Sequence, residues 1–245
     1  MLNNELQKIM FLDIETVPQT PDFDELGEEL CHLWEEKFNL IHKRMPEKYA
    51  VETTPAEAFN NSAGIYAEFG KIVCISVGFI YYQANTVHFR TKSFSGDDEK
   101  LILSEFSDMI AKFCTTKDHT LCGHNIKEFD IPYICRRMLI NEIKLPSIFD
   151  IAGKKPWEIN FIDTLELWKF GDYKNYTSLK LLTAVFGIPT PKDDIDGSQV
   201  ATVYYKEKNI ERIALYCQKD VVATAQVFLK MNGLKLINAD NIQFI

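Results

Sequence analysis

The sequence predicts an α/β fold in which a mixed sheet of five strands carries helices on both faces. Short runs rich in Ile and Val alternate along the chain with longer segments whose apolar residues recur at helical spacing. A short connector between the second and third strands favours antiparallel pairing, and the later alternation of strands with helices favours a mixed sheet. The five predicted strands are residues 9–16, 71–80, 86–94, 120–123 and 161–162.

The first predicted strand ends in two carboxylates. Residues 9–12 are all apolar, which is typical of a strand that is buried on both faces of its sheet. Asp13 and Glu15 follow, and they point to the same side because side chains alternate along a strand. Two such carboxylates repel each other, so we expect a divalent cation between them. The alternative is a strand that runs out into a polar turn before Pro18.

The predicted helices rest on the spacing of apolar residues and on the Gly, Pro and capping residues at their ends. They are expected at residues 24–44, 97–113, from 130 onward, 165–170, 178–186 and, as one or two helices, within 199–231. Residues 17–65 separate the first two strands without a strand of their own. We therefore expect one domain over residues 1–245 with an insertion at about 17–65, whose role the sequence leaves open.

Composition narrows the class of protein. The chain has 245 residues, of which 46% are hydrophobic, and this is enough to build a sizeable core. A net charge of −8 argues against broad non-specific binding to nucleic acid, but it does not exclude a nuclease with a carboxylate-rich metal site. The six cysteines form no Cys-x-x-Cys pair, which favours reduced thiols. Without a signal-peptide pattern or a long apolar run, we expect a cytoplasmic protein that does not contact membranes.

Two later stretches carry further candidate site residues. Asp130 is expected in the first turn of a helix, because Pro132 is tolerated only there. Tyr216 and Asp220 are four residues apart in a helix-forming run, so they lie on one face, one turn apart. The alternatives are an N-cap role for Asp130 and a solvated Asp220 beside a half-buried tyrosine.

Taken together, these stretches resemble the three motifs of the DEDD superfamily of 3′–5′ exonucleases, which is DnaQ-like with a ribonuclease H-like fold. The patterns are Asp-x-Glu at 13–15, Asn-x-x-x-Phe-Asp at 125–130 and Tyr-x-x-x-Asp at 216–220. Residues 123–133 look most like the exonuclease domain of family B DNA polymerases. The resemblance covers most of residues 8–232 and is weakest at 17–65. Leu215 stands where the other branch of the superfamily has His, so the chain resembles the DEDDy branch.

The resemblance implies a stand-alone, metal-dependent 3′–5′ exonuclease. Its substrate would be the 3′ end of single-stranded DNA, with RNA left open, and its products would be nucleoside 5′-monophosphates. Two divalent ions, Mg²⁺ or Mn²⁺, would activate water, neutralise the phosphate and help the 3′-oxygen to leave. Tyr216 would position the attacking water. The metal ligands implied are Asp13, Glu15, Asp130 and Asp220.

Contacts to substrate and partners are also expected from the resemblance. The expected substrate-binding residues are Thr16, Asn125, Phe129 and Tyr133. The two aromatic rings would stack on terminal bases, with core packing as the alternative for Phe129. Asp163 precedes Glu166 by three residues, which favours a helix cap over a metal ligand. Whether a DNA polymerase or a repair complex binds the chain in trans is left open.

Two other classes of protein fit part of the pattern. Haloacid-dehalogenase-like phosphatases also begin with a strand that ends in acid-x-acid-x-Thr. Their second acid is Asp, whereas this chain has Glu15, and Tyr216 with Asp220 has no role in that scheme. A non-catalytic nucleic-acid-binding module on the same fold is the other alternative. Such modules usually lose ligands, and this chain retains all four acids together with the tyrosine.

Overall fold

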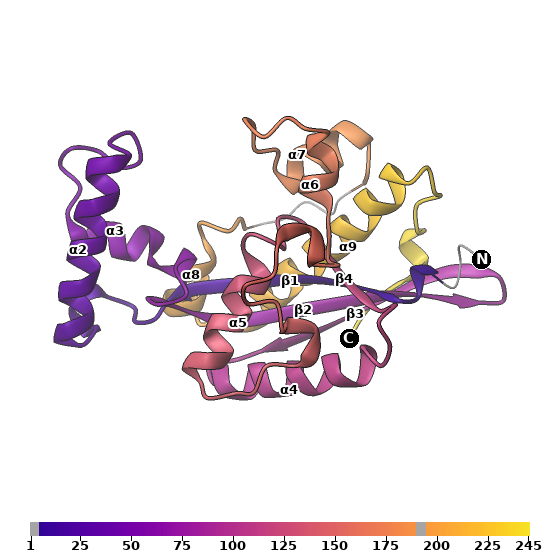
Figure 1. The fold of residues 1–245 in the computed structure, drawn as a ribbon, viewed down its shortest axis with the longest axis horizontal. Helices are drawn as coiled ribbons and strands as arrows, with labels where there is room; N and C mark the ends of the chain where they lie inside the picture. Colours follow the sequence, from indigo (N-terminus) through magenta and orange to yellow (C-terminus); the bar gives the residue numbers. More distant parts are fainter. Residues whose placement is uncertain (1–4, 190–194) are drawn as a thin grey trace.

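The core of the chain is a six-stranded mixed sheet (Figure 1). The computed structural model describes residues 5–189 and 195–245. Within them the strand order is β5-β4-β1-β2-β3-β6, with β1–β2 and β2–β3 antiparallel and the other pairs parallel. The strands are β1 (Ile9–Pro18), β2 (Gly70–Gln83), β3 (Thr86–Ser95), β4 (Thr120–Gly123), β5 (Ile162–Asp163) and β6 (Ile242–Phe244). The predicted α/β class with a mixed sheet is confirmed.

The predicted number of strands is wrong by one. The sixth strand, β6, pairs in parallel with β3 near the C-terminus, where Phe89 lies opposite Ile242. It is only three residues long, and two of them are exposed. A strand this short shows no alternation of apolar and polar residues, so the sequence carries no pattern that could have predicted it.

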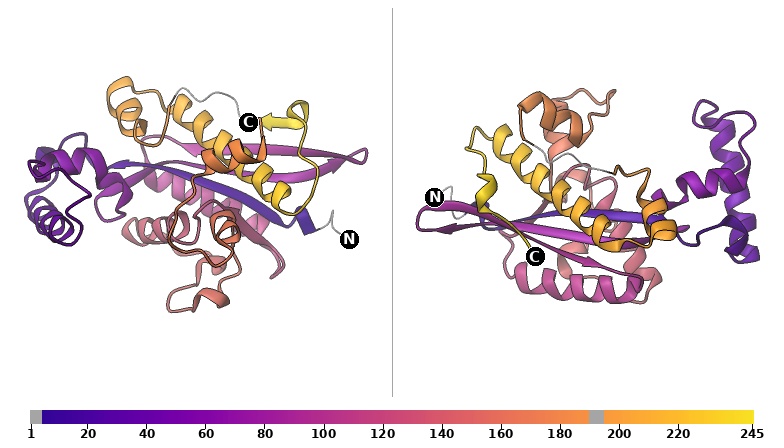
Figure 2. Two further views of the ribbon diagram at one scale, coloured as in Figure 1. Left: turned by 90° about the horizontal axis from the view of Figure 1, so that it is seen from above. Right: turned by 180° about the vertical axis from the view of Figure 1, so that it is seen from behind.

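Helices cover both faces of the sheet. The α4 and α5 helices lie on one face, and α9 lies along the other (Figure 2). The helices are α2 (Glu28–Arg44), α3 (Pro55–Ser62), α4 (Glu99–Phe113), α5 (Asp130–Ile140), α6 (Thr164–Lys169), α7 (Leu179–Phe186), α8 (Val200–Thr202) and α9 (Ile210–Met231). Shorter helical segments are η1 (Phe23–Glu25), η2 (Ala63–Ile65), η3 (Ser147–Phe149), η4 (Pro156–Glu158), η6 (Ala239–Asn241) and the π-helical η5 (Val203–Glu207). Among the described residues, no helix is both long and apolar enough to span a membrane.

The alternating side chains of β1 belong to two different cores. Met10, Leu12 and Ile14 pack in the cluster that includes α4 and α5. Phe11 packs in the cluster that includes Phe228 of α9. The prediction of a strand buried on both faces is thus confirmed. Because alternate residues share a side, Asp13 and Glu15 extend from the same side as Phe11, toward α9.

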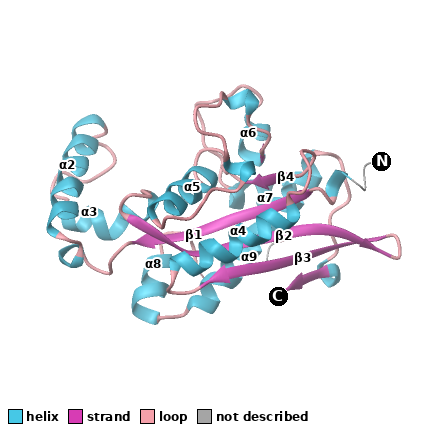
Figure 3. Ribbon diagram, turned by 60° about the horizontal axis from the view of Figure 1, so that its bottom comes forward, coloured by secondary structure: helices cyan, strands magenta, loops and turns pink. Residues whose placement is uncertain are grey.

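The segment between β1 and β2 forms a small helical unit beyond the end of the strands (Figure 3). Trp34 of α2 is fully buried and contacts Phe59 of α3 edge to face. Its indole N–H donates to the Pro55 carbonyl at 2.7 Å, which ties the two helices together. Thr54 and Glu57 form a capping box that fixes the start of α3. The insertion therefore has a hydrophobic cluster of its own.

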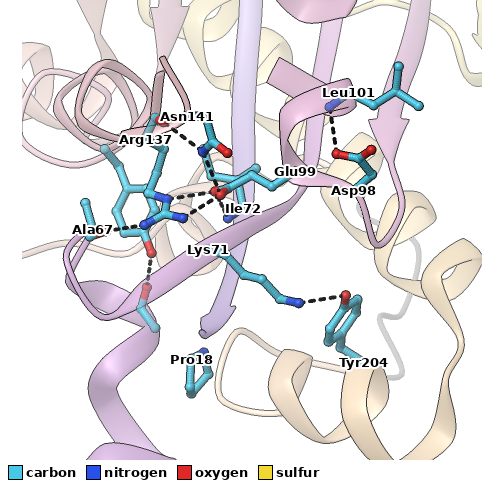
Figure 4. A network of polar contacts seen from close by, with 12 residues as sticks. Pro18, Ala67, Lys71, Ile72, Asp98, Glu99, Leu101, Arg137, Asn141 and Tyr204 are labelled. Atoms are coloured by element: carbon cyan, nitrogen blue, oxygen red, sulfur yellow. Dashed lines mark hydrogen bonds and ion pairs between the residues drawn. The ribbon is translucent and has the colours of Figure 1, made fainter. Parts of the chain in front are cut away.

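A buried ion pair joins both helices of the α4–α5 layer to the exit of the insertion (Figure 4). Arg137 of α5 donates to Glu99 of α4 through Nε at 2.9 Å and through its terminal nitrogen at 2.5 Å. Another terminal nitrogen of Arg137 donates to the Ala67 carbonyl, and the Ile72 N–H donates to Glu99. Each charge is therefore paired and hydrogen-bonded, as a buried charge requires.

Replacing Arg137 with methionine tests this network. Arg137→Met leaves the Glu99 carboxylate buried without its cation, so we expect the free energy of unfolding to fall by about 3–5 kcal/mol. Urea denaturation of both proteins measures the change. Lys127→Met is the matched control, because it breaks a more exposed pair with Glu166 and should cost at most about 1 kcal/mol. Equal losses in the two variants would show that the buried network does not hold these elements together.

Candidate active site

The structure brings the four predicted carboxylates and the tyrosine together from three elements. Asp13 and Glu15 come from β1, Asp130 is the first residue of α5, and Tyr216 and Asp220 lie on α9. The charges of Asp130 and Asp220 raise the pKa values of both Asp13 and Glu15. Tyr216 forms a hydrogen bond with Asp220 and feels the charges of Glu15 and Asp13. Residues more than 200 positions apart in the sequence thus share one site.

The pairing of β1 with β2 positions the first two acids. Asp13 lies opposite Ser76, and Glu15 lies opposite Cys74. Directly after Glu15 the register shifts, because Thr16 pairs with Ile72 and leaves Val73 as an extra residue on β2. Bulges of this kind increase the local twist and redirect side chains, and they are common beside active sites. The bulge therefore begins where β1 leaves the acid cluster.

Asp130 reaches the cluster from the start of α5. Phe129 occupies the N-cap position, so the alternative of an N-cap role for Asp130 is wrong by one residue. Asp130 is 3% exposed, and this burial raises the pKa of its carboxyl group to about 7. The nearby Asp163 charge also raises the pKa, while hydrogen bonds with the backbone of Asp130 and Ile14 partly lower it.

Without a bound cation, ionisation of the buried carboxyl groups in this site is unfavourable. Burial, followed by the charges of Asp220 and Asp130, raises the pKa of Asp13 well above its ordinary value. Burial and the Asp13 charge do the same for Glu15. Burial and the surrounding carboxylates also raise the pKa of the Tyr216 phenol. A bound cation would relieve this repulsion, since the charges of Asp130 and Asp220 raise the pKa values of both Asp13 and Glu15.

The donor atoms fit a hard divalent cation. Carboxylate oxygens of Asp13 and Glu15 lie with the Cys217 sulfur in a group whose ligand atoms are all within 4.8 Å of one another. The Cys217 thiol donates to the Asp13 carboxylate at 3.3 Å, and burial raises its pKa. It is therefore a protonated hydrogen-bond donor, which leaves oxygen as the ligand type. Oxygen ligands suit Mg²⁺ and Mn²⁺.

Cys217 is the residue of the cluster that the sequence analysis missed. It is buried on α9 three residues before Asp220, and residues three apart on a helix share a face. This spacing indicates from the sequence alone that the Cys217 thiol lies on the same helix face as Asp220. Cysteines are common in cores, however, so the spacing alone does not distinguish a thiol beside an acid from a packed one.

One of the predicted substrate contacts is contradicted by burial. Tyr133 is 1% exposed, and its hydroxyl donates to the Gly64 carbonyl at 2.8 Å. A ring in this position has no free face on which a base could stack, so the prediction for Tyr133 is wrong. Its hydroxyl instead ties α5 to the insertion, and a side chain on Gly70 would collide with it. Thr16 and half-buried Phe129 line a pocket beside Glu15, where both stay candidate contacts.

Asn125 and Asp163 form the turn that leads to Asp130. Asn125 has a left-handed backbone with φ 66°, and its N–H donates to Asp163 at 3.0 Å. Asp163 also accepts from the N–H groups of Leu165 and Glu166, so the predicted cap is confirmed. The Glu166 carboxylate pairs with Lys127 at 2.6 Å. Asn125 therefore has a structural role through its backbone, and its side chain stays a candidate substrate contact.

Comparison with known proteins adds a family to this geometry. A family described as "Predicted 3'-5' exonuclease related to the exonuclease domain of PolB" matches residues 65–240, more than half of the chain. The chain belongs to this family. The matched segment includes Asp130, Tyr216 and Asp220, and it begins after Asp13 and Glu15. The first two acids are therefore placed in the site by the fold and not by the family match.

A solved structure supports the fold. The family B DNA polymerase from the hyperthermophilic archaeon Pyrobaculum calidifontis aligns with a TM-score of 0.51 at 14% identity. The alignment covers 91% of this chain and 24% of the polymerase chain. At this identity the likeness shows the fold alone, which is that of the ribonuclease H-like exonuclease domain. No curated protein matches the sequence closely enough to count as a relative.

The raised carboxyl pKa values predict how stability changes with pH. In the folded chain Asp130 keeps its proton up to about pH 7, whereas the unfolded chain loses it near pH 3.8. The folded state therefore binds more protons in this interval, and stability falls as pH rises through it. In EDTA we expect a lower Tm at about pH 8 than at about pH 5.5. Mg²⁺ should reduce the fall, since it binds the ionised carboxylates.

Asp13→Asn is the control for this prediction. It keeps the shape of the side chain and removes one of the repelling charges, so in EDTA the Tm near pH 8 should stay level or rise. The added stability from Mg²⁺ should shrink because a ligand is lost. A Tm in EDTA that increases with pH, or an Asp13→Asn variant that melts several degrees lower, would contradict the electrostatic description of the site.

Proposed function

We propose that the chain is a metal-dependent 3′–5′ exonuclease. It hydrolyses phosphodiester bonds at the 3′ end of single-stranded DNA and releases nucleoside 5′-monophosphates. The observation that carries this proposal is the convergence of four carboxylates and Tyr216 from β1, α5 and α9. The family assignment supports the exonuclease over a phosphatase, in which Tyr216 and Asp220 would have no role.

The acids would act as an oxygen-lined cradle. Asp13, Glu15, Asp130 and Asp220 would hold two divalent ions, Mg²⁺ or Mn²⁺, which when bound supply charge neutralisation, an activated water and stabilisation of the leaving 3′-oxygen. The protein holds the carboxylates in place on a buried strand and two helices. Because the cradle forms before substrate arrives, little reorganisation is needed during the reaction.

Tyr216 would orient the attacking water and not remove its proton. Burial and the neighbouring acids raise the pKa of its phenol, so the hydroxyl stays protonated at neutral pH. A phenol in this state is a poor base, but it donates and accepts hydrogen bonds. Its contact with Asp220 fixes the hydroxyl at the edge of the acid cluster. Correct positioning of a nucleophile by itself contributes to the rate.

The polarity and metal dependence of the reaction test the proposal. Single-stranded DNA and RNA labelled at the 5′ end should shorten progressively from the 3′ end in Mg²⁺ or Mn²⁺, with nucleoside 5′-monophosphates as products. A blocked 3′ end should resist, and EDTA should abolish the activity. Comparison of DNA with RNA in the same assay establishes the preferred substrate. Cleavage of circular single strands, or full activity in EDTA, would refute an exonuclease of this type.

Tyr216→Phe tests the role of the hydroxyl. The variant keeps the ring and removes only the group that orients water, so kcat should fall by about 10- to 100-fold while substrate affinity is unchanged. Steady-state kinetics and equilibrium binding in EDTA measure the two quantities. Tyr82→Phe, on the distant end of β2, is the matched control and should keep the wild-type rate. An undiminished rate in Tyr216→Phe would leave the tyrosine with a packing role alone.

A further inference from the structure

A pocket outside the acid cluster connects the catalytic strand to the insertion. Its cavity volume is about 250 Å³, and Glu15 and Thr16 line one side of it. The last turn of α3 lines another side through Asn60 and Asn61. Its remaining lining is Ile14, Pro18, Ser62, Gly64, Ile65, Phe129, Gly197, Ser198 and Ala201. Residues far apart in the sequence therefore enclose one space next to a predicted metal ligand.

The pocket has apolar walls and two polar side chains that are free to bind. Ile65 is 50% exposed and Phe129 is half-buried, so both present apolar surface to the pocket. Within the described part of the chain, neither the Asn60 nor the Asn61 amide has a hydrogen-bond partner. Ser62 differs, because its hydroxyl already bonds the Ala58 carbonyl and the Tyr49 hydroxyl. Apolar walls with a few polar groups are typical of a small-molecule subsite.

We propose that Asn60 and Asn61 of the insertion supply a polar wall for the base of the 3′-terminal nucleotide, in the pocket that Phe129, an expected substrate contact, also lines. This inference rests on the proposed exonuclease function. When a nucleotide's phosphate lies at the acids, its base lies on the far side of the sugar, outside the cluster. The pocket adjoins Glu15 and extends from it to the insertion, so it is open to a base next to the acids. The Phe129 ring offers a stacking surface for that base, and the two amides that line the same pocket offer hydrogen bonds to its edge.

The two amides suit an enzyme that removes any of the four nucleotides. A side-chain amide carries both donors and an acceptor, and rotation exchanges their positions. Exposed asparagines can therefore match the edges of different bases, whereas a fixed charged group would favour one pattern. The inferred specificity is for the presence of a base at the 3′ end and not for its identity.

The insertion is held firmly enough to act as a wall. The capping box of Thr54 and Glu57 fixes the start of α3, and the Trp34 indole binds its first carbonyl. Beyond its end, Tyr133 of α5 donates to Gly64, next to Ile65. Both ends of the α3–η2 segment are thus tied to other elements. The amides are held at a set distance from β1, which is what a specificity wall requires.

The experiment compares a normal 3′ end with an abasic one. Two single-stranded DNA oligonucleotides are used, identical except that the 3′-terminal residue of one is a tetrahydrofuran abasic analogue. Values of kcat/KM are measured for wild type, for the double variant Asn60→Ala/Asn61→Ala, and for Asn39→Ala. Asn39 is an exposed residue of α2 that does not line the pocket, so this variant is the matched control. Thermal unfolding of all three confirms that the substitutions do not disturb the fold.

We expect wild type and Asn39→Ala to prefer the normal end. The double variant should lose about 10-fold in kcat/KM on the normal end, as two hydrogen bonds would predict, and little on the abasic end. Its preference for a base therefore shrinks. Equal losses on both ends, or no loss on either, would overturn the subsite.

Equilibrium binding separates this inference from the proposed function. Fluorescence anisotropy of the same two oligonucleotides in EDTA compares their affinities without turnover. A wild-type protein that degrades neither oligonucleotide would refute the exonuclease proposal. The subsite would then stand if the double variant alone loses the preference for the normal end in binding, and it would fall if all three proteins bind the two ends alike.

Discussion

Mutual repulsion among buried carboxylates is the constraint on which the rest of the structure depends. Burial raises the pKa values of Asp13 and Glu15, and the charges of Asp130 and Asp220 raise them further. Other interactions in the fold must therefore hold these carboxylates close together. The fold does so by placing the first two acids on a strand that is paired on both sides and buried on both faces.

The two helices that bring the other acids are fixed by different means. The α9 helix is held by apolar packing, since Val221 and Phe228 lie in the core cluster beneath Phe11. The α5 helix is held partly by a buried ion pair, through Arg137 and Glu99. Apolar packing is non-directional, whereas the ion pair also fixes the orientation of the helix. Because Arg137 also binds the Ala67 carbonyl, one side chain orients α5 and secures the return of the insertion to β2.

Most of the fold could be predicted because it follows local patterns. The apolar run before Asp13 and the helical spacing of Tyr216 and Asp220 are consequences of strand and helix periodicity, which the sequence shows directly. The wrong predictions concern features that strand and helix periodicity does not reveal. Three residues are too few to reveal β6, and an aromatic such as Tyr133 can stack on a base or pack in a core with the same local sequence.

The remaining site features depend on contacts between distant segments. The helical spacing places Cys217 near Asp220, but its contact with Asp13 depends on the packing of α9 against β1, which no local pattern predicts. The proposed wall of Asn60 and Asn61 has no sequence signature, because an asparagine at the end of a helix is ordinary. Sequence patterns identify residues whose side chains could take part in catalysis. The three-dimensional fold determines which other residues surround these side chains.

The last residue pair of the β1–β2 ladder has an evolutionary consequence. Pro18 lies opposite Gly70, and the Gln19 N–H donates to the Phe69 carbonyl at 2.8 Å, so the helical unit enters and leaves the sheet at one point. In topology it is a hairpin loop, and the cost of lengthening a loop grows only slowly with its length. Such a unit can be enlarged, trimmed or exchanged over time without shifting the register that holds Glu15. Under the proposed function, chains with the same acid cluster can then differ in the wall that faces the end of their substrate.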